Sequence, residues 1–163
     1  MLYMTTASSY FHQWIVRRLD RFVGAPLEQW GPAYAATAPI GVIMPGCDPV
    51  QPDFVPVRAE NAGIIHDRRI RGAPDLIAQV LSLSNAEQDT VVKRRVYARA
   101  GVPEYWIIRP ETRDVLVCRD PDADLDDYTS TQRFDAAAVL QARQFPIALP
   151  VAELFTGAPD TTM

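Results

Sequence analysis

Residues 75–82, DLIAQVLS, form a mostly apolar run with the length of one β-strand. Such a run is typical of a strand that is buried on both faces, inside a sheet covered by other elements. Its one central polar side chain, Gln79, would need hydrogen-bond partners if it is buried. A chain of 163 residues has room for one domain around such a sheet. We therefore expect a single mixed α/β domain with this strand near its centre.

Two helices are predicted on either side of this run. Over residues 11–23 large apolar residues recur at spacings of three and four, which predicts an amphipathic helix. Ser8 or Ser9 is its expected N-cap and Gly24 its expected end. The second helix opens with a capping box at 84–87, SNAE, and runs to about Ala100 before Gly101.

The remaining elements are predicted to be short. Strands are expected at residues 33–36, 41–44, 54–57, 104–109, 114–118 and 128–134. A turn is expected to join the first two of these strands, and the strands at 104–109 and 114–118 are expected to form a hairpin. Pro56 favours an edge position for its strand. A short helix is expected at 150–155, and residues 1–7 and 156–163 are expected to be flexible.

Charge and composition exclude several classes of protein. Sixteen basic and twenty acidic residues give a net charge of −4, which disfavours a protein that coats nucleic acid non-specifically. A local basic patch remains compatible with that charge. No apolar run is long enough to cross a bilayer and no signal peptide is recognisable, so we expect a cytoplasmic protein. Cys47 and Cys118 lack metal-site spacing and are expected to be two reduced thiols.

Polar groups from three consecutive elements are the candidates for chemistry. They are Asp53 at the start of a strand, Gln79 in the central strand, and Lys93, the single lysine among sixteen basic residues. A carboxylate, a second oxygen ligand and a lysine suit metal-assisted phosphodiester hydrolysis. The oxygens hold the cation, the cation activates a water, and the lysine orients that water or stabilises developing charge.

Each of these residues also has a purely structural interpretation. Asp53 follows Pro52 and is then a turn or strand-start residue, and Gln79 is then a hydrogen-bonded core amide. Lys93 lies four residues after Asp89 and would form an ordinary surface pair with it. The pattern alone leaves both interpretations open.

Several segments of the chain resemble the Uma-two (Uma2) family of putative restriction endonucleases, which is placed in the PD-(D/E)XK nuclease superfamily. The matching segments are SSYFHQWIVRRL (8–19), QPDFVPV (51–57), GAPDLIAQVLSLS (72–84), YARAGVPEYWIIRPET (97–112) and LPVAELF (149–155). The resemblance implies a restriction-endonuclease-like mixed β-sheet flanked by helices and elaborated by extra strands. It also implies metal-dependent cleavage of DNA.

The family's functional residues carry over onto four positions of this chain. The resemblance implies that Asp53 is a metal ligand and that the backbone carbonyl of Val80 is a further one. Gln79 stands where the family has a metal-binding Glu, and Lys93 matches a lysine on the helix that follows. The implied cofactor is Mg²⁺ or Mn²⁺.

The change from Glu to Gln at position 79 removes one negative charge from the implied metal site. We expect weaker metal binding and slower catalysis, because Mg²⁺ prefers carboxylates. The chain is therefore either an impaired endonuclease or an inactive nuclease-fold protein that binds nucleic acid or protein. A third interpretation, a small metabolite-binding α/β protein, would show an enclosed apolar pocket, although no phosphate-binding glycine loop is present.

Candidate DNA contacts lie in two basic clusters. Arg69 and Arg71 belong to the segment HDRRIR at 66–71, and Arg94 lies beside Lys93, where a solvated helix face is an equal alternative. His12 is more readily a structural helix histidine than a site residue. Cutting both DNA strands needs two active sites, so a homodimer is expected.

Overall fold

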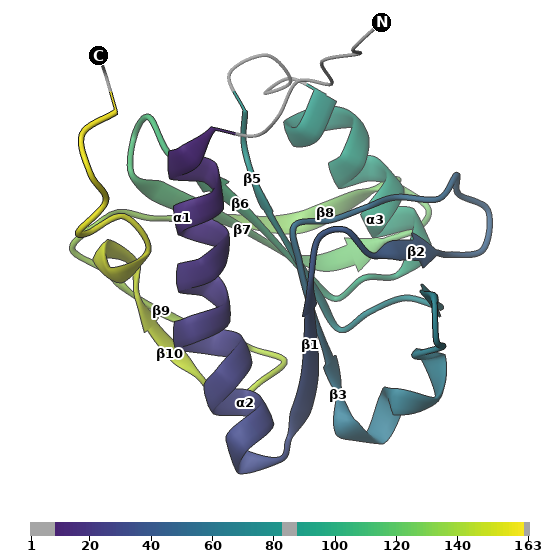
Figure 1. Ribbon diagram of the computed structural model, residues 1–163. Coiled ribbons are helices and arrows are strands. Elements are labelled where there is room, and N and C mark those ends of the chain that lie inside the picture. The colour runs from purple at the N-terminus through teal and green to yellow at the C-terminus, as the bar shows by residue number, and fades with distance from the viewer. Residues whose placement is uncertain (1–8, 83–87, 162–163) are drawn as a thin grey trace, which may run out of the picture.

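A six-stranded mixed sheet forms the centre of the protein in the computed structural model, which describes residues 9–82 and 88–161 (Figure 1). Its strand order is β1-β3-β5-β6-β7-β8, and only the β5–β6 pair is parallel. The strands are β1 (Ala33–Thr37), β3 (Phe54–Arg58), β5 (Leu76–Val80), β6 (Glu104–Arg109), β7 (Asp114–Asp122) and β8 (Asp127–Phe134). The predicted single α/β fold and the central position of residues 76–80 are confirmed.

Helices cover both faces of this sheet (Figure 1). On one face lie α1 (Tyr10–Leu19), the π-helical segment η1 (Asp20–Gly24) and α2 (Ala25–Trp30), which pack against Phe54, Ala78 and Trp106. On the other face lies α3 (Arg94–Ala100), preceded by the π-helical segment η3 (Gln88–Lys93). The α3 helix packs against alternate residues of the same strands, including Ile77 and Tyr105. Every residue of β5 is buried, as its apolar run predicts.

The first helix extends further than its sequence predicts. Ser9 is the N-cap, as expected, and its Oγ accepts a hydrogen bond from the backbone N–H of His12 at 3.0 Å. The predicted end at Gly24 is wrong, because the helical path continues to Trp30 and ends at Gly31, where φ is +93°. Gly24 is needed instead for close packing, since a Cβ there would lie 3.1 Å from the ring of Phe54.

One strand prediction is wrong, the edge position that Pro56 favours for its strand. The strand containing Pro56 is not an edge strand, because β3 lies between β1 and β5. Pro56 is tolerated because it is opposite Ala35, whose N–H turns away from β3 and is bound by the side chain of Glu28 at 3.1 Å. The missing N–H of Pro56 therefore faces β5, with which β3 pairs only at Phe54. Residues 33–37 and 41–43 also join different sheets, since β2 (Gly41–Ile43) pairs with β4 (Arg69–Arg71).

Several short elements carry no clear sequence signal. They are β4, the hairpin of β9 (Val139–Gln141) and β10 (Ala148–Pro150), and the 3-10 helix η2 (Ala59–Ile64).

The predicted short helix near the C-terminus is confirmed as η4 (Val151–Leu154), and α3 ends at Gly101 as expected. The predicted capping box at 84–87, the side chain of Asp89 and the predicted flexible segment 1–7 lie outside the described part of the chain. Cys47 and Cys118 are both free.

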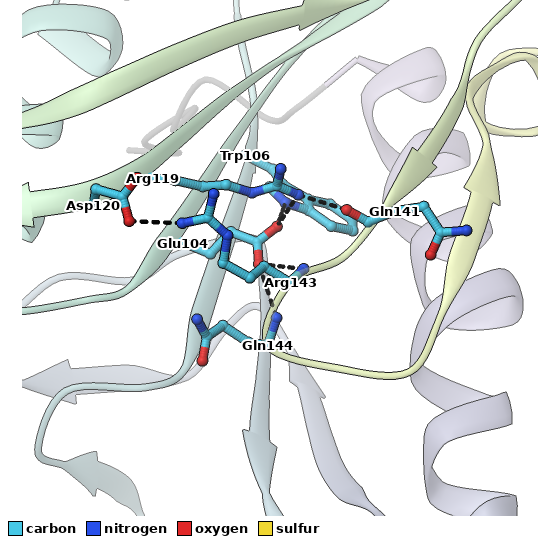
Figure 2. Close-up of polar contacts among 7 residues, drawn as sticks. All are labelled: Glu104, Trp106, Arg119, Asp120, Gln141, Arg143 and Gln144. Carbon is cyan, nitrogen blue, oxygen red and sulfur yellow. Dashed lines mark hydrogen bonds and ion pairs between the residues drawn. The ribbon is translucent and has the colours of Figure 1, made fainter.

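Glu104 joins the β9–β10 hairpin to the main sheet through a fully buried carboxylate (Figure 2). Its Oε1 accepts hydrogen bonds from the backbone N–H groups of Arg143 at 2.9 Å and Gln144 at 3.1 Å. Its Oε2 accepts from Trp106 Nε1 at 2.6 Å and from the Arg119 guanidinium at 3.2 Å. Since each oxygen has two donors and one donor is cationic, the cost of burying this charge is offset.

A second buried carboxylate, Asp114, closes the β6–β7 hairpin. It accepts hydrogen bonds from Arg109 at 2.7 Å, Arg133 at 2.5 Å and Thr112 at 2.8 Å. Burial by itself raises the pKa of Asp114, but the hydrogen bonds from Arg109, Arg133 and Thr112 outweigh it and hold that pKa at about 2.

We therefore expect acid to weaken the fold in a defined pH range. A pKa of about 2, below the ordinary value of 3.8, means that Asp114 takes up its proton at a higher pH in the unfolded chain than in the folded protein. The stabilisation by Asp114, about 2 kcal/mol, is present above pH 4 and is lost as pH falls toward 2. Urea unfolding of the wild type and Asp114→Asn between pH 2 and 7 measures this difference. The exposed Asp48→Asn is the control, and an equal pH dependence in both variants would contradict the assignment.

Candidate active site

The candidate residues gather at one edge of the sheet, where β5 and β6 end. Parallel strands have their carboxyl ends at the same edge, and the antiparallel β3 begins there. The register pairs Phe54 with Ala78, so one residue further along this register Asp53 lies opposite Gln79. The first turn of α1 and the start of α3 reach the same end of the molecule (Figure 1).

Asp53 is held at this edge by one oxygen. Its Oδ2 accepts a hydrogen bond from the backbone N–H of Val80 at 2.8 Å and lies 3.4 Å from Nε2 of His12. The Asp53 side chain is 17% exposed and that of His12 is 13% exposed. No partner of Oδ1 is found among the residues that the structure describes. One carboxylate oxygen is thus fixed by the protein.

Gln79 is turned toward a different layer. Its Oε1 accepts hydrogen bonds from the hydroxyls of Tyr97 at 3.2 Å and Tyr105 at 3.1 Å, and the residue is 4% exposed. Tyr97 belongs to α3, whereas the histidine beside Asp53 belongs to α1. The structural interpretation of Gln79, a hydrogen-bonded core amide, therefore describes its contacts in this structure.

Lys93 lies at the junction of η3 and α3, one helical turn before Tyr97. It is half-buried, on the helix that covers the same face of the sheet as Gln79. The sequence suggested that Asp53, Gln79 and Lys93 meet on one side of the sheet, and all three lie on or beside elements that reach this edge. The side chains of Asp53 and Gln79, however, point to opposite helical layers.

The oxygen donors at this edge fit a divalent cation held by a single carboxylate. In a strand the N–H and C=O of one residue point to the same side, so the Val80 carbonyl faces the edge where its N–H meets Asp53. Mg²⁺ is commonly held by one or two carboxylates, with water and substrate phosphates completing its shell. Among the described side chains, no three His, Cys, Asp or Glu groups lie together as a metal site. Asp53 Oδ1 and the Val80 carbonyl are therefore the two oxygens at this edge that could hold a cation.

The predicted DNA contacts differ in their surroundings. Arg69 and Arg71 flank the buried Ile70 on β4, so they lie on the same outer face of that strand. Arg94 instead forms an ion pair with Asp127 on β8, at 2.6 Å. Burial alone would raise the pKa of Asp127, but the hydrogen bond from Arg94 helps to lower it. The guanidinium of Arg94 is thus already engaged by the protein.

A pocket of about 280 Å³ lies at the same edge, directly after β5. It is partly open to solvent, and its lining is more apolar than polar but includes hydroxyl and charged groups. The lining residues are Leu81, Ser82, Thr90, Arg109, Pro110, Glu111 and Thr112. An open pocket with hydroxyl and charged side chains differs from the enclosed apolar pocket expected of a metabolite-binding protein.

One contact at the site is missed by sequence reasoning. His12 is given a structural role there, yet its ring lies against Asp53. The repeated apolar spacing of α1 places His12 near the start of a packed helix, but nothing local indicates its partner 41 positions away. The carboxylate of Glu104, within the segment GVPEYW, is a structural hub and not a site residue. Tyr105 and Trp106 are fully buried, as expected of core residues.

Comparison with known proteins identifies one family and one similar fold. The family model Uma2, described as putative restriction endonuclease, matches residues 1–152. A crystal structure of a putative nuclease belonging to DUF820 from Anabaena variabilis is similar, with a TM-score of 0.76 and 18% sequence identity. The match covers 94% of this chain and 85% of that one. None of the curated proteins matches the chain. No helix within the described residues is long and apolar enough to span a membrane.

Proposed function

Because the chain belongs to the Uma2 family of putative restriction endonucleases, we propose that it hydrolyses phosphodiester bonds of DNA with Mg²⁺ or Mn²⁺. We also propose that the reaction is impaired, because Gln79 stands where the family has a metal-binding Glu. The observation that carries this proposal is the hydrogen bond from Val80 N–H to Asp53 Oδ2, at 2.8 Å. This bond leaves Asp53 Oδ1 and the Val80 carbonyl at one accessible edge.

In this proposal Asp53 Oδ1 and the Val80 carbonyl hold the cation. When bound, the cation polarises a phosphate oxygen and lowers the pKa of a coordinated water. A site with one carboxylate carries less negative charge than one with two, so these oxygens would hold the cation weakly without the phosphate oxygens of a substrate. Gln79 does not supply a ligand while its Oε1 accepts from two tyrosine hydroxyls.

Lys93 is assigned to the phosphate. Its ammonium is a compact charge on a flexible stem, which suits a group that orients a water or stabilises an oxyanion. Arg69 and Arg71 are assigned to the DNA backbone, since two guanidinium groups on one outer face suit contacts with phosphates. Arg94 is not included, because Asp127 holds it.

Plasmid nicking with Mg²⁺ and Mn²⁺ tests this function. We expect slow nicking by the wild type, no nicking with a chelator, and none by Asp53→Asn, which removes the only carboxylate among the proposed ligands. We expect Lys93→Ala to slow nicking about 100-fold relative to the wild type, because one charged group at the phosphate is lost. Lys93→Arg should be slow as well, since the charge remains but the compact ammonium does not.

The controls exclude contamination and a general effect of charge. Arg17→Ala removes one exposed positive charge from α1 and should nick like the wild type. Nicking that persists in Asp53→Asn would assign the activity to another source or site. Absence of nicking by the wild type with either metal would contradict the hydrolase assignment.

A second candidate function is favoured by the contacts of Gln79. A glutamine whose Oε1 accepts from Tyr97 and Tyr105 is also what an inactive nuclease-fold protein would hold at this position. Such a protein binds nucleic acid or another protein without cutting. DNA binding that is weakened in Arg69→Ala and Arg71→Ala, together with no nicking under any metal, would support this function. Either function on duplex DNA would be served by a homodimer with two equivalent sites, which light scattering can test.

A further inference from the structure

We infer that His12 is a positioning residue for Asp53, and that its Nε2–H group holds Oδ2 so that Oδ1 faces the cation. This inference rests on the proposed function and adds a residue to that site. The two side chains approach to 3.4 Å, and both are mostly buried. Water therefore competes little for the contact between the ring and the carboxylate.

The second ring nitrogen decides what His12 can do. Nδ1 is buried and has no hydrogen-bond partner among the described residues. A proton on Nδ1 would be an unsatisfied buried donor, which is costly, whereas an unprotonated Nδ1 is the less costly alternative. The network therefore assigns the proton to Nε2, the nitrogen that faces Asp53.

The same observation argues against His12 as a metal ligand. A histidine that binds a metal through Nε2 carries its proton on Nδ1 and donates it to a carboxylate, a carbonyl or water. No such acceptor lies beside Nδ1 in the described part of the chain. His12 consequently acts through Asp53 and not on the cation itself.

One hydrogen bond and one ring contact on the same oxygen explain why positioning is needed. With the Val80 N–H alone, the carboxylate of Asp53 can turn about its Cβ–Cγ bond and still keep one hydrogen bond. The ring of His12, approaching from α1, gives Oδ2 a second neighbour from another layer. If the carboxylate turned until its two oxygens changed places, Oδ2 would lose both contacts. The two contacts therefore keep Oδ1 in its present position.

The fold also fixes where the ring can be. His12 is the third residue after the N-cap, and its own backbone N–H donates to Ser9 Oγ at 3.0 Å. Ile15 and Leu19, further along α1, are fully buried against the sheet. The cap sets the start of the helix and the packing sets its rotation about its axis. Together they fix the position of the His12 ring beside Asp53.

The tautomer is tested by nitrogen NMR of the intact protein, at a pH where the ring is neutral. The chain has two histidines, so His66→Gln assigns the spectrum. We expect His12 to show the Nε2–H tautomer, and its Nε2 signal to move in Asp53→Asn. A Nδ1–H tautomer, or an Nε2 signal indifferent to Asp53→Asn, would overturn the inference. This readout does not depend on metal binding or cleavage.

Positioning is tested by Mn²⁺ affinity, measured by electron paramagnetic resonance of free Mn²⁺. We expect His12→Leu, which keeps volume but has no donor, to weaken Mn²⁺ binding about tenfold. His12→Gln restores an N–H donor and should return the affinity to within about threefold of the wild type, with Gln13→Ala as the control on the same helix. Equal weakening in both His12 variants, or none in His12→Leu, would overturn the inference. A wild type that binds no Mn²⁺ would instead contradict the proposed function, and the NMR result then decides the role of His12 alone.

Discussion

Gln79→Glu is expected to raise Mn²⁺ affinity roughly 10- to 100-fold and to accelerate plasmid nicking. One added unit charge a few ångströms from a cation is worth a few kcal/mol at an effective dielectric constant of about 20, and burial removes part of that gain. Glutamate has nearly the shape of glutamine, and its carboxylate can accept the same hydrogen bonds from Tyr97 and Tyr105. To reach the cation, the new carboxylate has to turn from the α3 layer, which Gln79 faces, toward Asp53.

The same substitution should leave a signature in stability that does not depend on cleavage. Without metal, a negative charge at a position that is 4% exposed costs stability, and two neutral hydroxyls offset it only in part. With Mn²⁺ present, a ligand that binds only the folded state restores stability. We therefore expect the melting temperature of Gln79→Glu to fall below that of the wild type without metal, and to rise more steeply with Mn²⁺.

Differential scanning fluorimetry across a Mn²⁺ series measures both effects, with nicking followed in parallel. Gln132→Glu adds the same charge at an exposed position of β8 and is the matched control. If Gln79→Glu gains neither Mn²⁺ affinity nor metal-dependent stability, the natural glutamine at position 79 is not what limits metal binding. Equal gains in Gln132→Glu would attribute the effect to net charge.

Glu104→Gln is expected to lower the free energy of unfolding by about 3–5 kcal/mol, the usual cost of breaking a buried ion pair. An amide oxygen can still accept from the backbone N–H groups of Arg143 and Gln144. The amide nitrogen would then face Trp106 Nε1 and the guanidinium of Arg119, both of which are donors (Figure 2). Arg119 keeps a buried charge without its carboxylate, since its side chain is 12% exposed.

Urea unfolding monitored by tryptophan fluorescence measures this loss, which is a large part of the 5–15 kcal/mol typical of a domain. The control is Arg143→Ala, which removes the exposed Arg143–Asp120 pair and should cost at most about 1 kcal/mol. The double variant Glu104→Gln with Arg119→Met should be less destabilised than the sum of the single variants, because the unpaired charge is gone. A loss below about 1 kcal/mol in Glu104→Gln would show that the cluster is not a stabilising hub.

Glu104 and Asp53 are two carboxylates in different segments of the resemblance, and their contacts differ. Glu104 lies in GVPEYW, part of the resemblance to the family, yet all of its contacts are internal. Asp53 has one oxygen without a partner among the described residues. A carboxylate whose oxygens are all satisfied holds a fold together, whereas one with a free and partly exposed oxygen can bind a ligand.

Local patterns in the sequence determined most of the fold. The apolar run at 76–80 identified the central strand, because a strand buried on both faces has no room for alternating polar residues. Ser9 and Gly101 marked helix ends because caps and left-handed glycines act within a few residues. The resemblance to Uma2 rested on the same short segments and is confirmed over residues 1–152.

Tertiary structure alone decided which partners the polar side chains have. By strand alternation Asp53 shares a face with Val55, which lies on the α3 side, yet its carboxylate meets His12 of α1. The reason is that Asp53 stands just outside the ladder, where alternation no longer fixes the direction of a side chain. Glu104 likewise finds its donors 15, 39 and 40 positions away, and Arg94 finds Asp127 33 positions away. Hydrogen bonds and ion pairs over such distances depend on how the layers pack, and that packing is not encoded in any local spacing.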